Sequence, residues 1–149
     1  MTPTARRRWS DIGREYVNGI GSAGEAAVAA ELVAAGFHVY APVFCCPETD
    51  LIAELHGKLI RVQVKTNAGN EARLRFSAWN TSSTTYTGTA DWLAFHSLHY
   101  GITAFLKPEE AGCYPTFRYR PPENHQKRNS KIRYAKDYPL ERVIKEIRT

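Results

Sequence analysis

Residues 49–66 read TDLIAELHGKLIRVQVKT. Apolar and polar residues alternate on both sides of a central His-Gly pair, a pattern typical of an antiparallel hairpin with a two-residue loop. In that register Asp50 lies opposite Gln63 on one face of the ladder, and Lys65 is the diagonal neighbour of Asp50 on the same face. A carboxylate, an amide and an ammonium group would therefore lie together at the open end of the hairpin, and this grouping indicates a site.

The prediction of a site depends on this register. Ile60, Val62 and Val64 are expected on the core face of the second strand, opposite the face that carries the polar residues. A shift of one residue in the pairing would exchange the two faces and turn the polar set toward the core.

Residues 22–36 are rich in strong helix formers and end in a glycine suited to the position after a helix. They predict a helix with Glu25 on the same face as Ala29 and Leu32, the face that packs on the sheet. Two explanations of Glu25 stay open. Ser22 and Glu25 have the spacing of a capping box, whereas a carboxylate directed toward the sheet needs a partner or a metal ion.

The rest of the chain predicts one compact domain. Further strands are predicted at residues 37–41, 73–79, 91–96 and 102–106, and an amphipathic helix at residues 140–147. A chain of 149 residues is long enough to form a core of its own. The first 20 residues are arginine-rich and predict a basic arm or a short helix.

The composition favours a polyanionic partner. The chain has 20 Lys and Arg against 15 Asp and Glu, a net charge of +5. Residues 118–136 concentrate this excess, with seven basic residues against one acidic residue, and are expected to bind phosphate groups; the alternative is a solvated charged surface. Three cysteines, two of them adjacent, fit neither a disulfide framework nor a zinc pattern and suit a reducing compartment. Because no segment is typical of a signal peptide or a membrane span, we expect a cytoplasmic protein with no membrane partner.

Three short motifs occur in order along the predicted elements: Gly24-Glu25 on the helix, Thr49-Asp50 on the first hairpin strand and Gln63-Val64-Lys65 on the second. In this order they resemble the motifs of the PD-(D/E)XK nuclease superfamily. The Gln-x-Lys form is similar to that of the short group I intron homing endonucleases, and the helix region is more distantly similar to archaeal Holliday junction resolvases. Thr49 stands where the superfamily has proline, and Gln63 stands where it usually has an acidic residue.

The resemblance implies an α/β (α+β) fold with a restriction-endonuclease-like core, in which a helix is followed by a mixed β-sheet (αβββαβ type) with an extra β-hairpin and a C-terminal helix. A single nuclease domain would span residues 1–149, with 1–20 as a basic arm and 118–149 as a basic segment plus closing helix. The implied function is a Mg-dependent, homing-type endonuclease acting on double-stranded DNA, encoded by a bacterium or a phage. Two alternatives stay open: a Holliday junction resolvase or a phage or repair nuclease on the same fold, and a non-catalytic DNA-binding module.

The resemblance also implies a set of functional residues. The catalytic residues would be Glu25, Asp50, Gln63 and Lys65. Mg²⁺, or Mn²⁺ in its place, would be bound by Asp50, Glu25, the amide oxygen of Gln63 and the main-chain carbonyl of Val64. DNA would be bound by Arg6, Arg7, Arg8, Arg118, Arg120, Lys127, Arg128, Lys131 and Arg133. Since cutting two strands needs two sites, a homodimer or homotetramer is expected.

Overall fold

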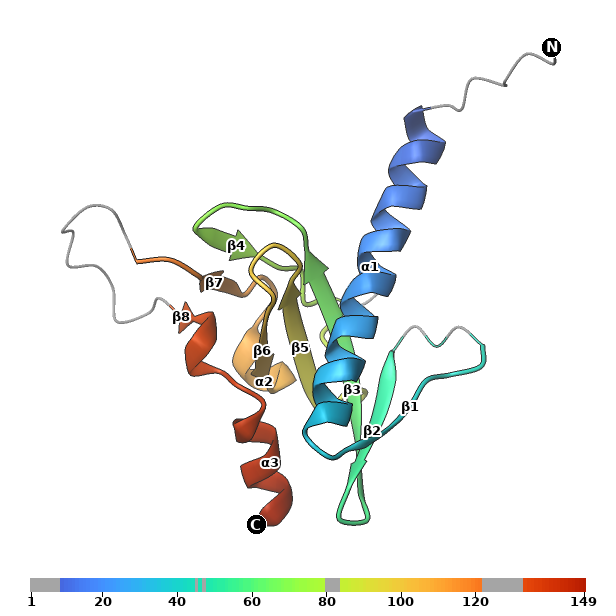
Figure 1. Cartoon of the computed structure of the whole chain (residues 1–149), viewed down its shortest axis with the longest axis vertical. Helices are drawn as coiled ribbons and strands as arrows, with labels where there is room; N and C mark the ends of the chain where they lie inside the picture. Colours follow the sequence, from blue (N-terminus) through green and yellow to red (C-terminus); the bar gives the residue numbers. More distant parts are fainter. Residues whose placement is uncertain (1–8, 45, 47, 80–83, 122–132) are drawn as a thin grey trace.

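The computed structural model describes residues 9–44, 46, 48–79, 84–121 and 133–149, with side chains from residue 16 onward. Figure 1 shows the elements along the chain. The helices are α1 (Trp9–Ala34), α2 (Pro108–Ala111) and α3 (Glu141–Arg148), with a 3-10 turn at Ala135–Asp137. The strands are β1 (His38–Tyr40), β2 (Leu51–Leu55), β3 (Lys58–Asn67), β4 (Arg73–Arg75), β5 (Trp92–Ser97), β6 (Ile102–Leu106), β7 (Thr116–Arg118) and β8 (Arg133–Tyr134). Of the helices in these residues, none has the length and apolar character needed to span a bilayer.

The strands form two sheets. The larger one has the order β1-β2-β3-β5-β6, with β3 and β5 parallel and the other neighbours antiparallel. The smaller one has the order β4-β7-β8. The predicted class, a helix followed by a mixed sheet and a closing helix, is confirmed. The connection from β3 to the parallel strand β5 contains β4 and no helix among its described residues.

The hairpin formed by β2 and β3 has the predicted register. Leu51 pairs with Val62 and Leu55 pairs with Lys58, so the loop consists of His56 and Gly57 alone. Both loop residues have positive φ, 51° and 77°, as a tight hairpin turn that follows the twist of the strands requires. The backbone nitrogen of the residue before β2, Asp50, continues the ladder by donating to the carbonyl oxygen of Val62 at 3.1 Å.

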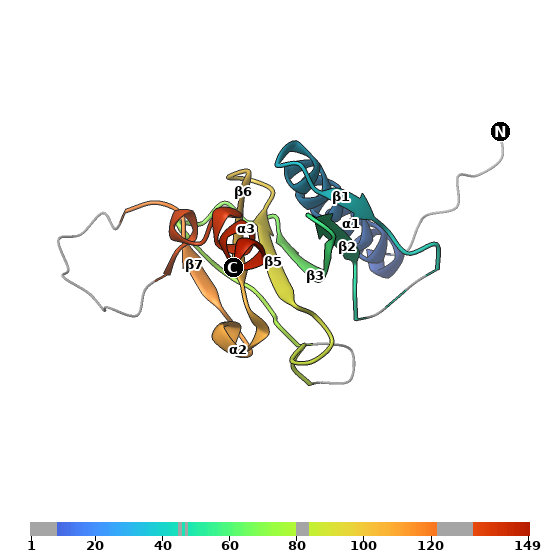
Figure 2. The same cartoon turned by 90° about the horizontal axis from the view of Figure 1, so that it is seen from below.

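Helices α1 and α3 cover one face of the larger sheet. Val28 and Leu32 of α1 and Val143 of α3 are buried with Val62 and Val64 of β3 in one core cluster. Figure 2 shows α1 on one side of this sheet, with α2 and β7 on the other side. The apolar face of β3 is therefore the predicted one, and burial of these aliphatic side chains is the main source of stability at this layer.

The smaller sheet and α2 cover the opposite face. Phe76, Phe95 and Phe117 form a ring cluster there, with centroids 5.3 to 5.9 Å apart. The polar face of β3 meets this second layer at the C-terminal end of the strand, where Nδ2 of Asn67 donates to the carbonyl oxygen of Arg75 at 2.9 Å and Nζ of Lys65 donates to that of Trp79 at 3.4 Å. On the same face, Gln63 is only 5% exposed.

Helix α1 begins well before the predicted start at Ser22. Ser22 is an interior residue of the helix, so the capping-box explanation of Glu25 is wrong, because the N–H groups that it would cap are already bonded within the helix. Residues 9–20, predicted as part of a basic arm or a short helix, form the first turns of α1, which extend past the sheet in Figure 1. The arginines at positions 6, 7 and 8 lie outside the described residues.

Two further differences concern the smaller sheet. The strand predicted at residues 73–79 ends at Arg75, although Ala78 still donates its backbone N–H to the carbonyl of Cys113 at 2.8 Å. Strands β7 and β8 were not predicted, because these short segments are ordered by long-range pairing with β4 and with each other and not by a pattern of their own.

Candidate active site

Asp50 is fixed against strand β3 by two hydrogen bonds. Its Oδ2 accepts one from the backbone N–H of Val64 and one from Nε2 of Gln63, both at 2.7 Å. These are the cross-strand neighbours that the register predicts. In a strand the N–H and C=O of one residue point to the same side, so the Val64 carbonyl oxygen is directed to the edge where Asp50 lies.

The glycine that precedes Glu25 allows α1 to approach the site closely. A Cβ on Gly24 would lie 1.8 Å from Oγ1 of Thr66 on β3, so α1 can approach the strand this closely only without a side chain at position 24. This close approach places Glu25 near Asp50. Burial raises the pKa of Glu25, and the negative charge of Asp50 raises it further. The structure therefore favours the second explanation of Glu25, a carboxylate directed toward the sheet.

Asp50 and Gln63 offer oxygen atoms that suit a hard cation. Burial raises the pKa of Asp50, and the Val64 N–H and the charge of Lys65 partly offset this rise. Oε1 of Gln63 is buried and has no hydrogen-bond partner in the described structure, which is costly unless another group binds it. Two carboxylates, an unpaired amide oxygen and a carbonyl oxygen form the kind of donor set that Mg²⁺ binds while keeping several waters.

The two acidic side chains, Glu25 and Asp50, are too few to coordinate a metal ion without other ligands. Among the described residues, no three His, Cys, Asp or Glu side chains cluster as a metal site. A cation here would therefore depend on the amide and carbonyl oxygens and on water. His96, interpreted from the sequence as an ordinary histidine, has its Nδ1 2.8 Å from Oγ1 of Thr103.

Lys65 is held by the connection between β3 and β5. Its Nζ donates to the hydroxyl of Tyr86 at 2.8 Å and to the carbonyl oxygen of Trp79 at 3.4 Å. It also lies 4.8 Å from the centroid of the Tyr86 ring, which is only 2% exposed. The sequence analysis assigned no role to Tyr86 or Trp79. Both lie in the connection between β3 and β5, and the position of this connection depends on how the two strands pair and not on a spacing of residues in the sequence.

The predicted DNA-binding residues are only partly described. Arg118 lies on β7, Arg133 on β8, and Arg120 just beyond β7 with its guanidinium 5.9 Å from the ring centroid of Tyr100. These three thus lie on or next to the smaller sheet, whereas Asp50 directly precedes β2 of the larger sheet. Lys127, Arg128 and Lys131 lie outside the described residues, as do the arginines of residues 6–8.

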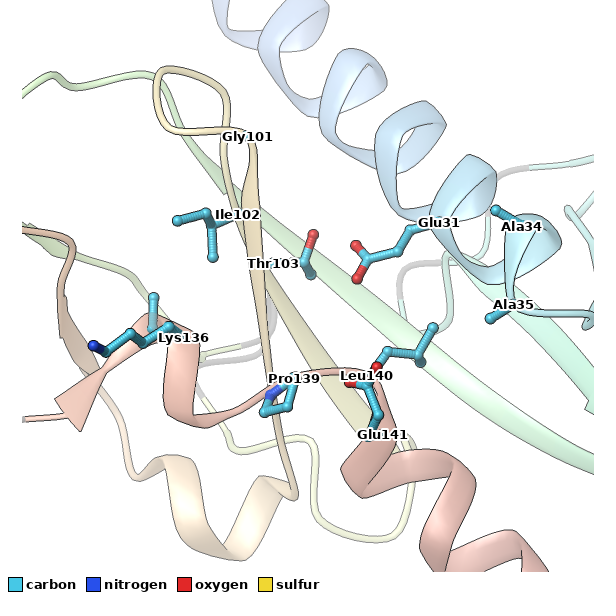
Figure 3. Close-up of a pocket in the computed structure, with 11 residues that line it drawn as sticks. Glu31, Ala34, Ala35, Gly101, Ile102, Thr103, Lys136, Pro139, Leu140 and Glu141 are labelled. Atoms are coloured by element: carbon cyan, nitrogen blue, oxygen red, sulfur yellow. The ribbon is translucent and has the colours of Figure 1, made fainter.

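A separate cavity of about 460 Å³ lies between the C-terminal end of α1, β6 and the start of α3. Figure 3 shows the carboxylate of Glu31 directed toward Thr103 there. Burial raises the pKa of Glu31, a hydrogen bond from Thr103 lowers it, and the charge of Glu141 raises it. None of the predicted site residues lines this cavity, so it is not part of the candidate active site.

Gly24→Ala is expected to destabilise the protein by about 1–3 kcal/mol, because the added methyl group overlaps Thr66 and forces α1 away from β3. Thermal or urea unfolding measures the loss. Gly19→Ala is the matched control, since a Cβ at Gly19 meets no atom within 4 Å and alanine favours the helix. Equal stability of the two variants would contradict the close approach.

Glu25→Gln is expected to reduce the pH dependence of stability in EDTA. The folded state retains protons on Glu25 and Asp50 at higher pH than the unfolded chain does, so stability falls as pH rises through their pKa values. The wild-type Tm should decrease as pH rises above about 4, the pKa range of these carboxyls in the unfolded chain, and that of the variant should decrease less. Parallel Tm curves for the two proteins would argue against the carboxylate pair; Glu109→Gln on α2 serves as the exposed control.

Comparison with known proteins gave a family match and a structural match. The sequence profile of the PD-(D/E)XK endonucleases matches residues 17–97, a range that contains the four predicted catalytic residues. A solved structure of a bacterial homing endonuclease, I-Ssp6803I, superposes with a TM-score of 0.62 over 87% of this chain and 96% of that chain. At 15% sequence identity, this similarity establishes a shared fold. No curated protein matches the sequence significantly.

Proposed function

Because the chain belongs to the PD-(D/E)XK endonuclease family, we propose that it is a metal-dependent enzyme that hydrolyses phosphodiester bonds within duplex DNA. One observation carries the proposal. The carboxylate of Asp50 is held against β3 beside the unpaired Oε1 of Gln63, and Glu25 is near enough for the Asp50 charge to raise its pKa. A divalent cation stabilises such a set of oxygen atoms.

The proposed ligands are Asp50, Glu25, the side-chain oxygen of Gln63 and the main-chain oxygen of Val64. Mg²⁺ is the proposed ion, with Mn²⁺ as a substitute, because all four donors are oxygen atoms. The chemistry that such a cation supplies is a lowered pKa of bound water and neutralisation of the charge that develops on the phosphate. The Asp50 hydrogen bonds hold the carboxylate in one orientation, so little reorganisation is needed during the reaction.

Lys65 is proposed to act on the reacting phosphate. Its ammonium group donates hydrogen bonds as a compact point charge, which suits a non-bridging phosphate oxygen or the attacking water. The bonds to Tyr86 and Trp79 restrict the orientations of its side chain. A preorganised donor of this kind stabilises the transition state more than the ground state.

The whole chain, residues 1–149, is proposed to act as one nuclease domain. The basic residues on and near the smaller sheet, Arg118, Arg120 and Arg133, would contact the DNA backbone together with those outside the described ranges. A homodimer or homotetramer would supply the two sites that a double-strand cut needs. The shared fold with a homing endonuclease is the reason to propose a homing-type role.

A non-cleaving DNA-binding module is the second candidate. Gln63 supports it, because a neutral amide in place of a carboxylate leaves two acidic residues, Glu25 and Asp50, for the cation. The ordered hydrogen bonds of Asp50 and Lys65 favour the enzyme, since a module that only binds DNA does not require them.

The test is cleavage of supercoiled and linear duplex DNA by the purified protein in Mg²⁺ and in EDTA. We expect Mg²⁺-dependent cleavage, measured on gels. Retardation of DNA with no cleavage in either condition would favour the binding module, and equal cleavage in EDTA would refute the metal. A four-way DNA junction as substrate and competitor separates a junction resolvase from a linear-duplex enzyme.

A further inference from the structure

The outer face of the ribbon formed by β4 and β7 is basic and aromatic. Arg73 pairs with Arg118, and Arg75 pairs with Thr116. The pairing continues past β4, because Phe76 donates its N–H to Pro115 at 2.9 Å and Ala78 donates to Cys113 at 2.8 Å. Residues 73–79 and 113–118 thus form one extended antiparallel ribbon.

The side chains of this ribbon alternate strictly between two faces. Leu74, Phe76, Ala78 and Phe117 are buried toward the larger sheet. Period-two alternation then assigns the following residues to the outer face: Arg73, Arg75, Ser77 and Trp79 from one side, and Tyr114, Thr116 and Arg118 from the other. Tyr114 is 52% exposed, so this aromatic side chain is not needed to fill the core.

Arg75, Tyr114 and Trp79 form a contiguous cluster on that face. The Cζ atom of Arg75 lies 4.2 Å from the centroid of the Tyr114 ring, and the Trp79 ring meets the Tyr114 ring edge-on, with centroids 6.3 Å apart and an interplanar angle of 61°. Neither Arg75 nor Arg73 has a carboxylate partner among the described residues. The face therefore offers uncompensated positive charge next to an exposed ring, which complements a nucleotide, with its anionic phosphate and planar base.

Trp79 connects this cluster to the proposed catalytic lysine. The carbonyl oxygen of Trp79 lies 3.4 Å from Nζ of Lys65. Trp79 also forms a β-bridge with Thr85, and the next residue, Tyr86, binds the same Nζ through its hydroxyl. A DNA strand that reaches Lys65 would therefore pass near this cluster.

We propose that a nucleobase near the scissile phosphate leaves the duplex stack and packs on the Arg75–Tyr114 pair, while Arg73 and Arg118 bind the neighbouring phosphates of the same strand. The proposal rests on the proposed nuclease function and adds to it the surface that holds the cut strand. Arg75 is suited to this role because its guanidinium group already packs on the Tyr114 ring. A base stacks on such a plane in any sequence context, so the contact positions DNA without selecting a sequence.

The experiment measures binding of a fluorescent oligothymidylate, whose bases are free to stack, by anisotropy in EDTA. Tyr114→Ala should weaken binding about tenfold, and Tyr114→Phe should not, because the ring is retained. Tyr40→Ala is the matched control: Tyr40 is 50% exposed on β1, at the edge of the larger sheet. Both tyrosines are surface residues, so melting curves should show folded variants.

The salt dependence separates stacking from charge. Arg73→Gln should reduce the slope of log K against log salt by about one, and Tyr114→Ala should leave the slope unchanged. The proposal is overturned if Tyr114→Ala binds as Tyr40→Ala does, or if the wild-type protein does not bind the oligothymidylate. Cleavage of duplex DNA in Mg²⁺ is assayed in parallel. If binding depends on the Tyr114 ring but no cleavage occurs, the proposed nuclease function is refuted and the proposed stacking surface is supported.

Discussion

Asp50→Asn is expected to reduce the rate of DNA cleavage by about a thousandfold, which corresponds to about 4 kcal/mol of transition-state stabilisation. Asparagine has nearly the same shape, and its side-chain oxygen can still accept the Val64 N–H that now binds Oδ2. It lacks the charge that a divalent cation needs. Single-turnover cleavage in Mg²⁺ measures the effect, because it isolates the chemical step from product release.

The same variant separates a catalytic defect from a folding defect. Since burial raises the pKa of Asp50, removing the charge should raise the Tm at neutral pH in EDTA. The increase in Tm that Mg²⁺ produces in the wild type should disappear. Asp137→Asn, a change at an exposed carboxylate of the 3-10 turn, is the control. Cleavage by Asp50→Asn within a few-fold of the wild type would refute the assignment.

Lys65→Met is expected to lower cleavage by roughly a hundredfold to a thousandfold while DNA affinity changes little. Methionine retains an unbranched apolar side chain but removes the ammonium that Tyr86 and Trp79 now hold. If Lys65 acts on the reacting phosphate, its loss appears in the cleavage step. Single-turnover rates and DNA dissociation constants, measured on the same substrate, distinguish the two effects.

A matched control lies on the same strand. Lys58, at the other end of β3, donates its ammonium to the carbonyl of Ile147 in α3. Lys58→Met should leave cleavage close to that of the wild type. Mg²⁺ should still raise the Tm of Lys65→Met, because the proposed cation ligands are unchanged. A cleavage defect in both lysine variants, or in neither, would contradict the specific role of Lys65.

The hairpin could be predicted in register because every determinant of it is local. Alternation fixes which residues share a face, and a two-residue loop with positive φ at His56 and Gly57 fixes the pairing. Asp50 and Gln63 were therefore placed together from the sequence, and the structure brings them to 2.7 Å. The functional roles of these residues stay predictions that the variants above test.

The start of α1 and the partners of Lys65 could not be predicted. The first turns of α1 extend past the sheet, so they show no apolar period that marks a helix. Tyr86 and Trp79 belong to a connection whose course depends on β3 and β5 pairing in parallel. Strands β7 and β8 gain their order from long-range pairing and not from their own residues.

The sequence by itself determined the hairpin and the Asp50, Gln63 and Lys65 grouping on it, because a strand has a fixed period of two and a tight turn allows one register. The sequence left two explanations of Glu25 open, a helix-capping residue and a site residue, because its spacing from Ser22 is compatible with both. The tertiary structure excludes the cap, because Ser22 lies inside α1, and directs the Glu25 carboxylate toward the sheet. The packing of Gly24 on Thr66 brings α1 against β3, and that contact joins residues far apart in the chain, which no local pattern encodes.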